Sequence, residues 1–113
     1  MPQTVTLNTN SDFRRVYARG KVYTDPALVS YVMKNRAGIC RIGITTSKKI
    51  GNAVQRNRAR RVIRAAAERL PHFAPGYDIV FVARAKTARK KSTELSVIME
   101  RQLLSAGVIE HEA

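Results

Sequence analysis

The chain has 113 residues, a length that supports one hydrophobic core and is too short for two. Its 21 lysines and arginines outnumber 8 aspartates and glutamates, which gives a formal net charge of +13 and predicts binding to a polyanion. No stretch approaches ~18 uninterrupted apolar residues, so a membrane-spanning helix is excluded, and residues 1–4 lack the basic-then-apolar layout of a secretory signal. We therefore expect a single cytoplasmic domain over residues 1–113.

A short helix is expected near the N-terminus, capped by Asn10 or Ser11 and ended by Gly20. Its apolar side chains follow helical spacing and comprise Phe13, Val16 and Tyr17. By spacing alone, these three residues are typical of a helix face that packs in a core.

Alternating apolar residues predict three short strands in the next part of the chain, over residues 21–23, 27–34 and 39–46. In the second of these strands, the alternation places Val29 and Tyr31 on one face. A turn rich in polar residues separates the second strand from the third. We expect these two strands to pair as an antiparallel hairpin.

A longer helix is expected from about residue 53 to residue 70, where Pro71 stops it, and an apolar strand follows over residues 78–83. A last helix is expected to be capped by Ser92 or Thr93 and ended by Gly107, and the tail, about residues 108–113, is expected to fray. The order helix, strands, helix, strand, helix predicts an α+β single-domain sandwich of three helices on a sheet of about four strands. General rules would make any parallel crossover right-handed.

The chain has one cysteine and no motif that would hold a metal ion. Cys40 lies in an apolar run, so we expect it to be buried, and a lone cysteine that cannot form an internal disulfide suits a reducing cytosol. His72 and His111 are far apart and have no ligand-type neighbour at a useful spacing, so no Cys/His metal centre is expected.

The helix expected over residues 53–70 separates apolar side chains from basic ones. Its apolar stripe comprises Ala59, Val62, Ile63, Ala66 and Leu70. Its other side carries Arg56, Asn57, Arg60, Arg61 and Arg64, with Arg58 on a flank. Solvated helix faces ordinarily mix charges, because like charges four residues apart are destabilising, yet no acidic residue occurs between Asp25 and Glu68. Since a guanidinium group holds phosphate oxygens with two hydrogen bonds, we interpret this helix as polyanion-binding rather than as inert surface.

At this helix the sequence resembles a known family. The segment Lys48-Lys49-Ile50-Gly51-Asn52-Ala53-Val54-Gln55-Arg56-Asn57-Arg58, followed by Arg60-Arg61 and Arg64, resembles the signature of the bacterial ribonuclease P protein subunit. The resemblance extends along nearly the whole chain, and further blocks that look like the family are Asp12-Phe13 and Gly76-Tyr77-Asp78-Ile79-Val80.

The resemblance implies a protein cofactor of the ribonucleoprotein that removes the 5′ leader from precursor tRNA. It also implies a left-handed βαβ crossover around the basic helix, in place of the general expectation. The residues that would bind the catalytic RNA are Lys48, Lys49, Asn52, Arg56, Asn57, Arg58, Arg60, Arg61 and Arg64. The residues that would line a cleft for the leader are Phe13, Tyr17, Val29 and Tyr31, which implies that Phe13 and Tyr17 are partly exposed rather than core.

The chain itself carries no motif for catalysis: no positioned carboxylate pair, no nucleophile beside a base, and no phosphate-binding loop of the Walker type. We therefore expect the catalytic groups in the RNA, with Mg²⁺ held mainly by RNA and substrate phosphates. The protein would reduce repulsion between two polyanions, which raises substrate affinity and lowers the magnesium requirement. The expected partners are the ribonuclease P catalytic RNA and precursor tRNA, with no membrane and no obligate protein partner.

Two other classes of RNA- or DNA-binding protein share this size and charge. A structural protein of another ribonucleoprotein, such as the ribosome, would use a basic helix without a leader cleft. A DNA-compacting protein would bind duplexes tightly with a steep salt dependence and no preference for RNA.

Overall fold

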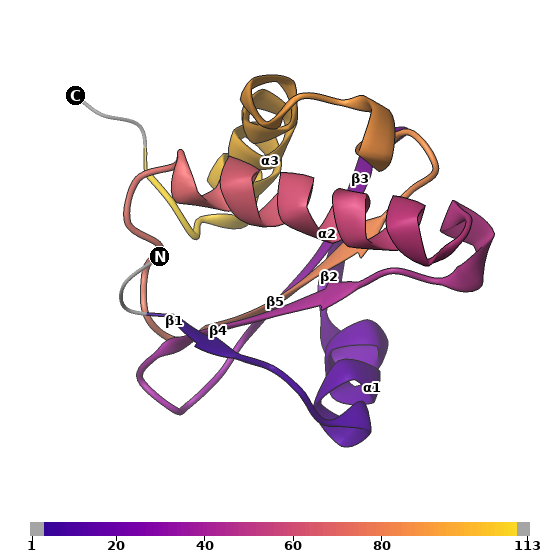
Figure 1. The fold of residues 1–113 in the computed structure, drawn as a ribbon. Helices are drawn as coiled ribbons and strands as arrows, with labels where there is room; N and C mark the ends of the chain where they lie inside the picture. The colour runs from indigo at the N-terminus through magenta and orange to yellow at the C-terminus, as the bar shows by residue number, and fades with distance from the viewer. Residues whose placement is uncertain (1–3, 111–113) are drawn as a thin grey trace.

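The structure is a computed structural model that describes residues 4–110 (Figure 1). The strands are β1 Thr4–Thr6, β2 Lys21–Asp25, β3 Leu28–Lys34, β4 Cys40–Thr45 and β5 Tyr77–Ala83. The helices are α1 Asn10–Arg19, α2 Ala53–Glu68 and α3 Ser92–Ala106, with two 3₁₀ turns, η1 Lys48–Ile50 and η2 Thr87–Arg89. The predicted α+β class with three helices is confirmed.

The five strands form one mixed sheet in the order β1-β4-β5-β3-β2. β5 is antiparallel to β3 and parallel to β4, and β1 is parallel to β4. The predicted hairpin between β3 and β4 is therefore wrong, because β5 lies between them. Ile79, Val80 and Phe81 of β5 are fully buried, and a strand that is apolar on both faces is most stable at the centre of a sheet.

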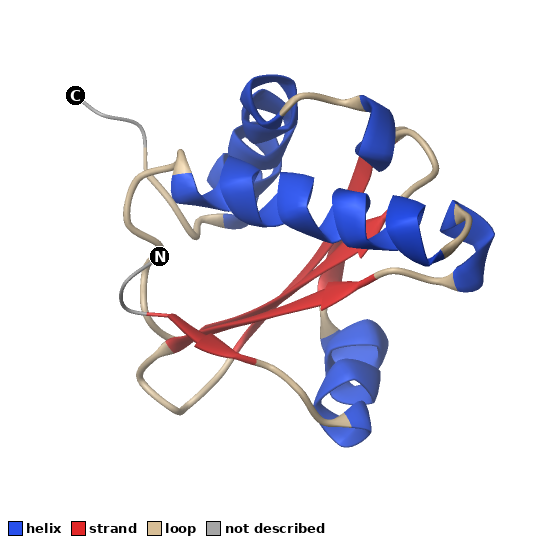
Figure 2. Cartoon of the chain, viewed as in Figure 1, coloured by secondary structure: helices blue, strands red, loops and turns tan. Residues whose placement is uncertain are grey.

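Helices cover both faces of the sheet: α2 and α3 lie on one face and α1 lies on the other (Figure 2). The larger core lies under α2 and α3, where Ile63, Phe81 and Leu95 are fully buried. The smaller core lies under α1 and contains Val16 and Val80. The sheet thus separates two hydrophobic cores, and the long basic helix connects β4 to β5 across the larger one.

The predicted apolar stripe of α2 faces the sheet and α3. Ala59, Ile63 and Ala66 are buried, and Val62 and Leu70 pack against the same core. Because the stripe is fully used in packing, the opposite side of α2 is the one that is presented to solvent.

The first strand and several helix ends differ from the sequence-based expectation. The sheet has five strands rather than about four, since the three residues of β1 pair with β4, a tertiary contact that no local pattern reveals. Thr9, rather than Asn10 or Ser11, caps α1 by accepting a hydrogen bond from the Asp12 N–H. Lys91, rather than Ser92 or Thr93, occupies the N-cap position of α3, because the helix already includes both of those residues. The hand of the β4–α2–β5 crossover stays a prediction.

The end of the chain is better packed than we expected. Val108 and Ile109 are buried, and the Val108 carbonyl accepts a hydrogen bond from Ala74 N–H at 2.9 Å, so the predicted fraying is wrong for these residues. Residues 111–113 lie outside the described residues. Gly107 ends α3 with φ +80°, a left-handed conformation that favours glycine, as expected.

Within residues 4–110, none of the helices combines the length and the apolar character that crossing a bilayer requires.

Candidate nucleic-acid interface

The N-terminus of α2 is set by a reciprocal pair of hydrogen bonds. The side-chain oxygen of Asn52 accepts from Gln55 N–H at 3.0 Å, and Gln55 Oε1 accepts from Asn52 N–H at 2.9 Å. Gly51 has φ +140°, and a Cβ there would overlap the Gln55 side chain. Asn52, which we expected to bind RNA, is thus the helix cap, and Lys48 and Lys49 lie exposed on η1 just before it.

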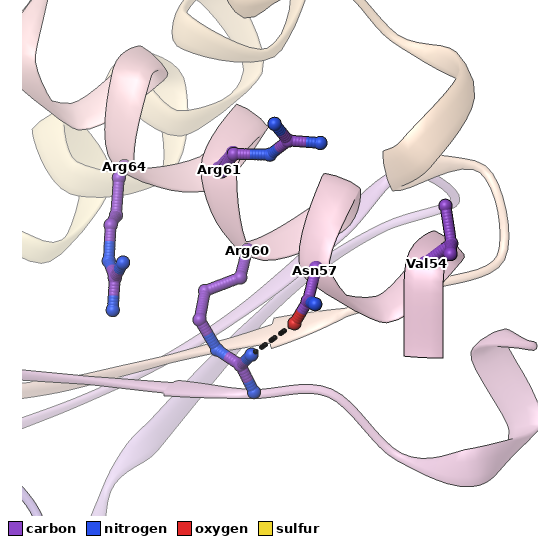
Figure 3. A pocket seen from close by; sticks show the side chains of 5 residues that line it. All are labelled: Val54, Asn57, Arg60, Arg61 and Arg64. Atoms are coloured by element: carbon purple, nitrogen blue, oxygen red, sulfur yellow. Dashed lines mark hydrogen bonds between the residues drawn. The ribbon is translucent and has the colours of Figure 1, made fainter. Parts of the chain in front are cut away.

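The solvent side of α2 carries a concentrated row of guanidinium groups, which we call the α2 arginine face. Its members are Arg60, Arg61 and Arg64. Together with Asn57 and Val54 they border an open hollow of about 590 Å³. Figure 3 shows Arg60 and Arg64 extending toward the sheet while Arg61 points away from it. Within the described residues, none of these three arginines has a carboxylate oxygen within 4.0 Å, so their charge is uncompensated by the protein.

Arg60 is held in place by neutral partners. Its Nη2 donates to Thr46 Oγ1 at 2.8 Å. Its Nη1 donates to Asn57 Oδ1 at 3.3 Å, the hydrogen bond drawn in Figure 3. Hydroxyl and amide oxygens orient the guanidinium group without neutralising it, so Arg60 keeps its full charge for an anion.

A second hollow of about 490 Å³, the α1 groove, lies between α1 and the end of β4. It is lined by Asn10, Phe13, Arg14, Tyr17, Ile44, Thr45, Thr46 and Arg60. Arg60 therefore borders both the α1 groove and the hollow on the α2 arginine face. The two surfaces that the sequence pointed to are continuous through this one side chain.

Two of the four residues predicted for the leader cleft form the aromatic wall of the α1 groove. The Tyr17 side chain is 37% exposed and its hydroxyl lies 2.7 Å from Thr45 Oγ1. The Phe13 ring is half-buried, because it lies directly over Gly43, where a Cβ would come within 2.6 Å of it. The partial exposure of Phe13 and Tyr17 is as the family resemblance implied.

The other two cleft residues lie deeper. The Tyr31 ring meets the Tyr17 ring edge-on at a centroid distance of 5.0 Å and is half-buried. Val29 is only 5% exposed, so it has almost no surface to offer to a ligand.

The two remaining arginines of the predicted RNA-binding set do not border the hollow on the α2 arginine face. Arg56 is half-buried. Arg58 points to the opposite flank of α2, where its Nε donates to the backbone carbonyl of Ala88 at 2.7 Å. The sequence signature therefore groups residues that the helix distributes around its circumference.

The chain is similar to known proteins along most of its length. The family model described as Ribonuclease P matches residues 1–107 of the chain. The chain belongs to the ribonuclease P protein family. It is 45% identical over 100 residues to the ribonuclease P protein component of Clostridioides difficile (strain 630), covering 84% of this chain and 87% of that protein.

Solved structures of ribonuclease P proteins share the fold. The Staphylococcus aureus RNase P protein is 31% identical with a TM-score of 0.78, covering 91% of this chain and 95% of that one. The Thermotoga maritima protein is 26% identical with a TM-score of 0.77, covering 94% and 98%. Membership in the ribonuclease P protein family implies a part in an endoribonuclease complex of tRNA processing and partnership with the ribonuclease P RNA.

A buried ion pair next to the α1 side of the sheet was not anticipated from sequence. Asp78 is fully buried and accepts two hydrogen bonds from Arg41, at 2.7 and 2.9 Å, and one from Asn35 Nδ2 at 2.7 Å. The hydrogen bonds to Asp78 raise the pKa of the Arg41 guanidinium above its ordinary value. Arg41 lies 37 residues from Asp78, so only the pairing of β4 with β5 reveals that this cation is neutralised.

Cys40 is buried as predicted, and burial, aided by the charge of Asp78, raises the pKa of its thiol to about 12. Within the described residues, no group of three or more His, Cys, Asp and Glu side chains could hold a metal ion.

Proposed function

We propose that this protein binds the catalytic RNA of ribonuclease P through the α2 arginine face and the 5′ leader of precursor tRNA in the α1 groove. The observation that carries the proposal is Arg60, which borders both surfaces and has no carboxylate within 4.0 Å among the described residues. A cation at this junction can contact phosphates where the two RNAs meet. We propose that the protein acts in the cytoplasm.

The chemistry of each surface suits its proposed ligand. Arginine forks hold phosphate oxygens with paired hydrogen bonds and keep their charge at any relevant pH. Exposed aromatic rings such as Tyr17 stack on unpaired bases with little sequence preference, for about 1–3 kcal/mol per base. A leader that differs from one substrate to the next requires such tolerance.

We propose further that the RNA supplies the catalytic groups and, with the substrate phosphates, holds most of the Mg²⁺. The protein's contribution is electrostatic: a chain of net charge +13 reduces the repulsion between catalytic RNA and precursor tRNA. The expected consequences are higher substrate affinity and a lower magnesium requirement.

The test is cleavage of a precursor tRNA by a bacterial ribonuclease P RNA at low magnesium, with and without the protein. We expect specific 5′ cleavage that depends on the protein and is lost in R60Q/R64Q. The matched control is K34Q/R36Q, which removes two exposed cations outside the α2 arginine face and the α1 groove. Identical magnesium dependence with and without protein would refute the proposal, and RNA binding without preference for precursor over mature tRNA would indicate a structural ribonucleoprotein component instead.

A further inference from the structure

A second concentration of positive charge lies in the segment between β5 and α3, residues 84–91, which we call the basic turn. Five of its eight residues are cations: Arg84, Lys86, Arg89, Lys90 and Lys91. Within the described residues none of them has a carboxylate oxygen within 4.0 Å. Glu94, the nearest acidic residue in sequence, accepts instead from the Lys91 backbone N–H at 3.0 Å.

The basic turn has an ordered backbone despite this repulsion. Thr87 is fully buried, donates its hydroxyl to the Ala27 carbonyl and accepts from Arg84 N–H at 2.8 Å. From the other side, Arg58 of α2 donates to the Ala88 carbonyl. Anchors at two points keep like charges together on one short turn, so their mutual repulsion is relieved when a polyanion binds there.

The basic turn and the α1 groove lie on different flanks of α2. Arg58 and Arg60 are two residues apart on a helix, so their side chains leave the axis about 160° apart. The basic turn joins the Arg58 flank, seen as the orange turn above α2 in Figure 1, while the α1 groove joins the Arg60 flank. The exposed ridge between the flanks carries Val54 and Arg61.

We propose that the basic turn is a second RNA-binding surface, which contacts a phosphate strand of the catalytic RNA other than the one held by the α2 arginine face, and that Arg58 positions this turn. The inference rests on the proposed function. With cations on both flanks, α2 lies between two phosphate strands of a folded RNA. The leader lies on the Arg60 flank, which assigns the strand at the basic turn to the catalytic RNA.

The test compares two variants that each remove three positive charges. K86Q/R89Q/K91Q changes exposed cations of the basic turn, and K34Q/R36Q/R101Q changes exposed cations elsewhere. Lys34 pairs with Tyr77, the first residue of β5, whereas the basic turn follows Ala83, the last residue of β5. Lys34 therefore lies about 20 Å from the start of the basic turn. Long-range electrostatics affects both variants alike, whereas phosphate contact affects only the first.

The readout is equilibrium binding to a bacterial ribonuclease P RNA over a salt series. For the basic-turn variant we expect the slope of log K against log salt to fall by about 2–3, since each phosphate contact contributes about 0.7–0.9. We expect the control slope to change by less than about 1. Equal changes in both variants would overturn the inference. If the triple variant does not fold, R89Q/K91Q against R36Q/R101Q gives the same comparison.

The role of Arg58 is tested by R58K, which keeps the charge but removes the Nε–H that reaches Ala88. We expect faster amide exchange in the basic turn and weaker RNA binding, with no further loss of binding when R58K is added to K86Q/R89Q/K91Q. Additive losses would show that Arg58 contacts RNA directly and would overturn its positioning role.

A final arm measures binding of precursor tRNA to the assembled holoenzyme, where we expect the basic-turn variant to behave as wild type. A defect confined to this arm would assign the phosphates to the substrate and overturn the assignment to the catalytic RNA. If the wild-type protein fails to bind the ribonuclease P RNA, the proposed function itself is refuted. If the wild-type protein and the basic-turn variant bind this RNA equally well, only the proposed role of the basic turn is refuted.

Discussion

The contact between α1 and β4 can be tested by adding one methyl group at Gly43. A Cβ at Gly43 would lie 2.6 and 2.7 Å from two carbons of the Phe13 ring and 3.2 Å from Leu7 Cβ. Carbon atoms pack at about 3.5–4.0 Å, so the ring has to retreat by about 1 Å. Because Tyr17 follows Phe13 by one helical turn, a retreat of α1 shifts the aromatic wall of the α1 groove.

We expect G43A to lower the free energy of unfolding by about 1–3 kcal/mol, the usual cost of overpacking. In the holoenzyme, G43A is expected to weaken binding of precursor tRNA with a leader and to leave binding of mature tRNA unchanged. Urea denaturation measures the first effect, and equilibrium binding of the two tRNAs measures the second.

A double-mutant cycle identifies the cause. In an F13A background the overlap with the ring is absent and only the milder 3.2 Å contact with Leu7 Cβ remains, so G43A is expected to cost no more than about 0.5 kcal/mol there. If G43A costs the same with and without the Phe13 ring, or if G43A is as stable as wild type, the ring does not lie on Gly43 and the description of the groove is wrong.

Three further predictions concern the scaffold. Because burial raises the thiol pKa of Cys40 to about 12, only about one thiol in ten thousand is ionised at pH 8. We therefore expect the folded protein to resist alkylation while the urea-unfolded protein reacts rapidly, and equal alkylation rates would refute this. R41M leaves the buried Asp78 carboxylate without its bidentate partner and is expected to lower the free energy of unfolding in urea titrations by about 2–4 kcal/mol. The double variant R41M/D78N is expected to recover part of this stability, and full stability of R41M alone would contradict the pairing. G51A combines a φ of +140° with overlap of the Gln55 side chain and is expected to lower the free energy of unfolding by about 2 kcal/mol. Adding Q55A to G51A removes the overlap but not the backbone strain, so complete recovery of stability would contradict a contribution from strain.

The basic helix and its polarity could be predicted from sequence because both depend on local order. A 3.6-residue period puts Ala59, Ile63 and Ala66 in one buried stripe, and the chain between Asp25 and Glu68 has no acidic residue to neutralise the other side. α3 follows the same period, since its inner residues Leu95, Met99 and Leu103 are spaced four residues apart and are fully buried.

Strand neighbours could not be predicted in this way. Alternation identifies a strand and its two faces, but it does not say which strand lies beside it, and β5 entered between β3 and β4 from more than 30 residues away. The burial of Gln102 has the same origin: its side chain accepts from Ser30 Oγ and donates to the carbonyls of Tyr23 and Leu28, contacts that exist only once α3 lies on the β2–β3 hairpin.

The sequence by itself determined the α+β class, the amphipathic basic helix and the net charge of +13, since these follow from composition and from periods of two and 3.6 residues. Only the tertiary structure decided which cations are available to RNA. Arg41 is neutralised by Asp78, Arg58 is directed to the Ala88 carbonyl, and Arg60 is held by Thr46 at the junction of two hollows. The physical reason is that a charge is free or paired according to neighbours brought within a few ångströms by chain folding, and those neighbours are distant in sequence.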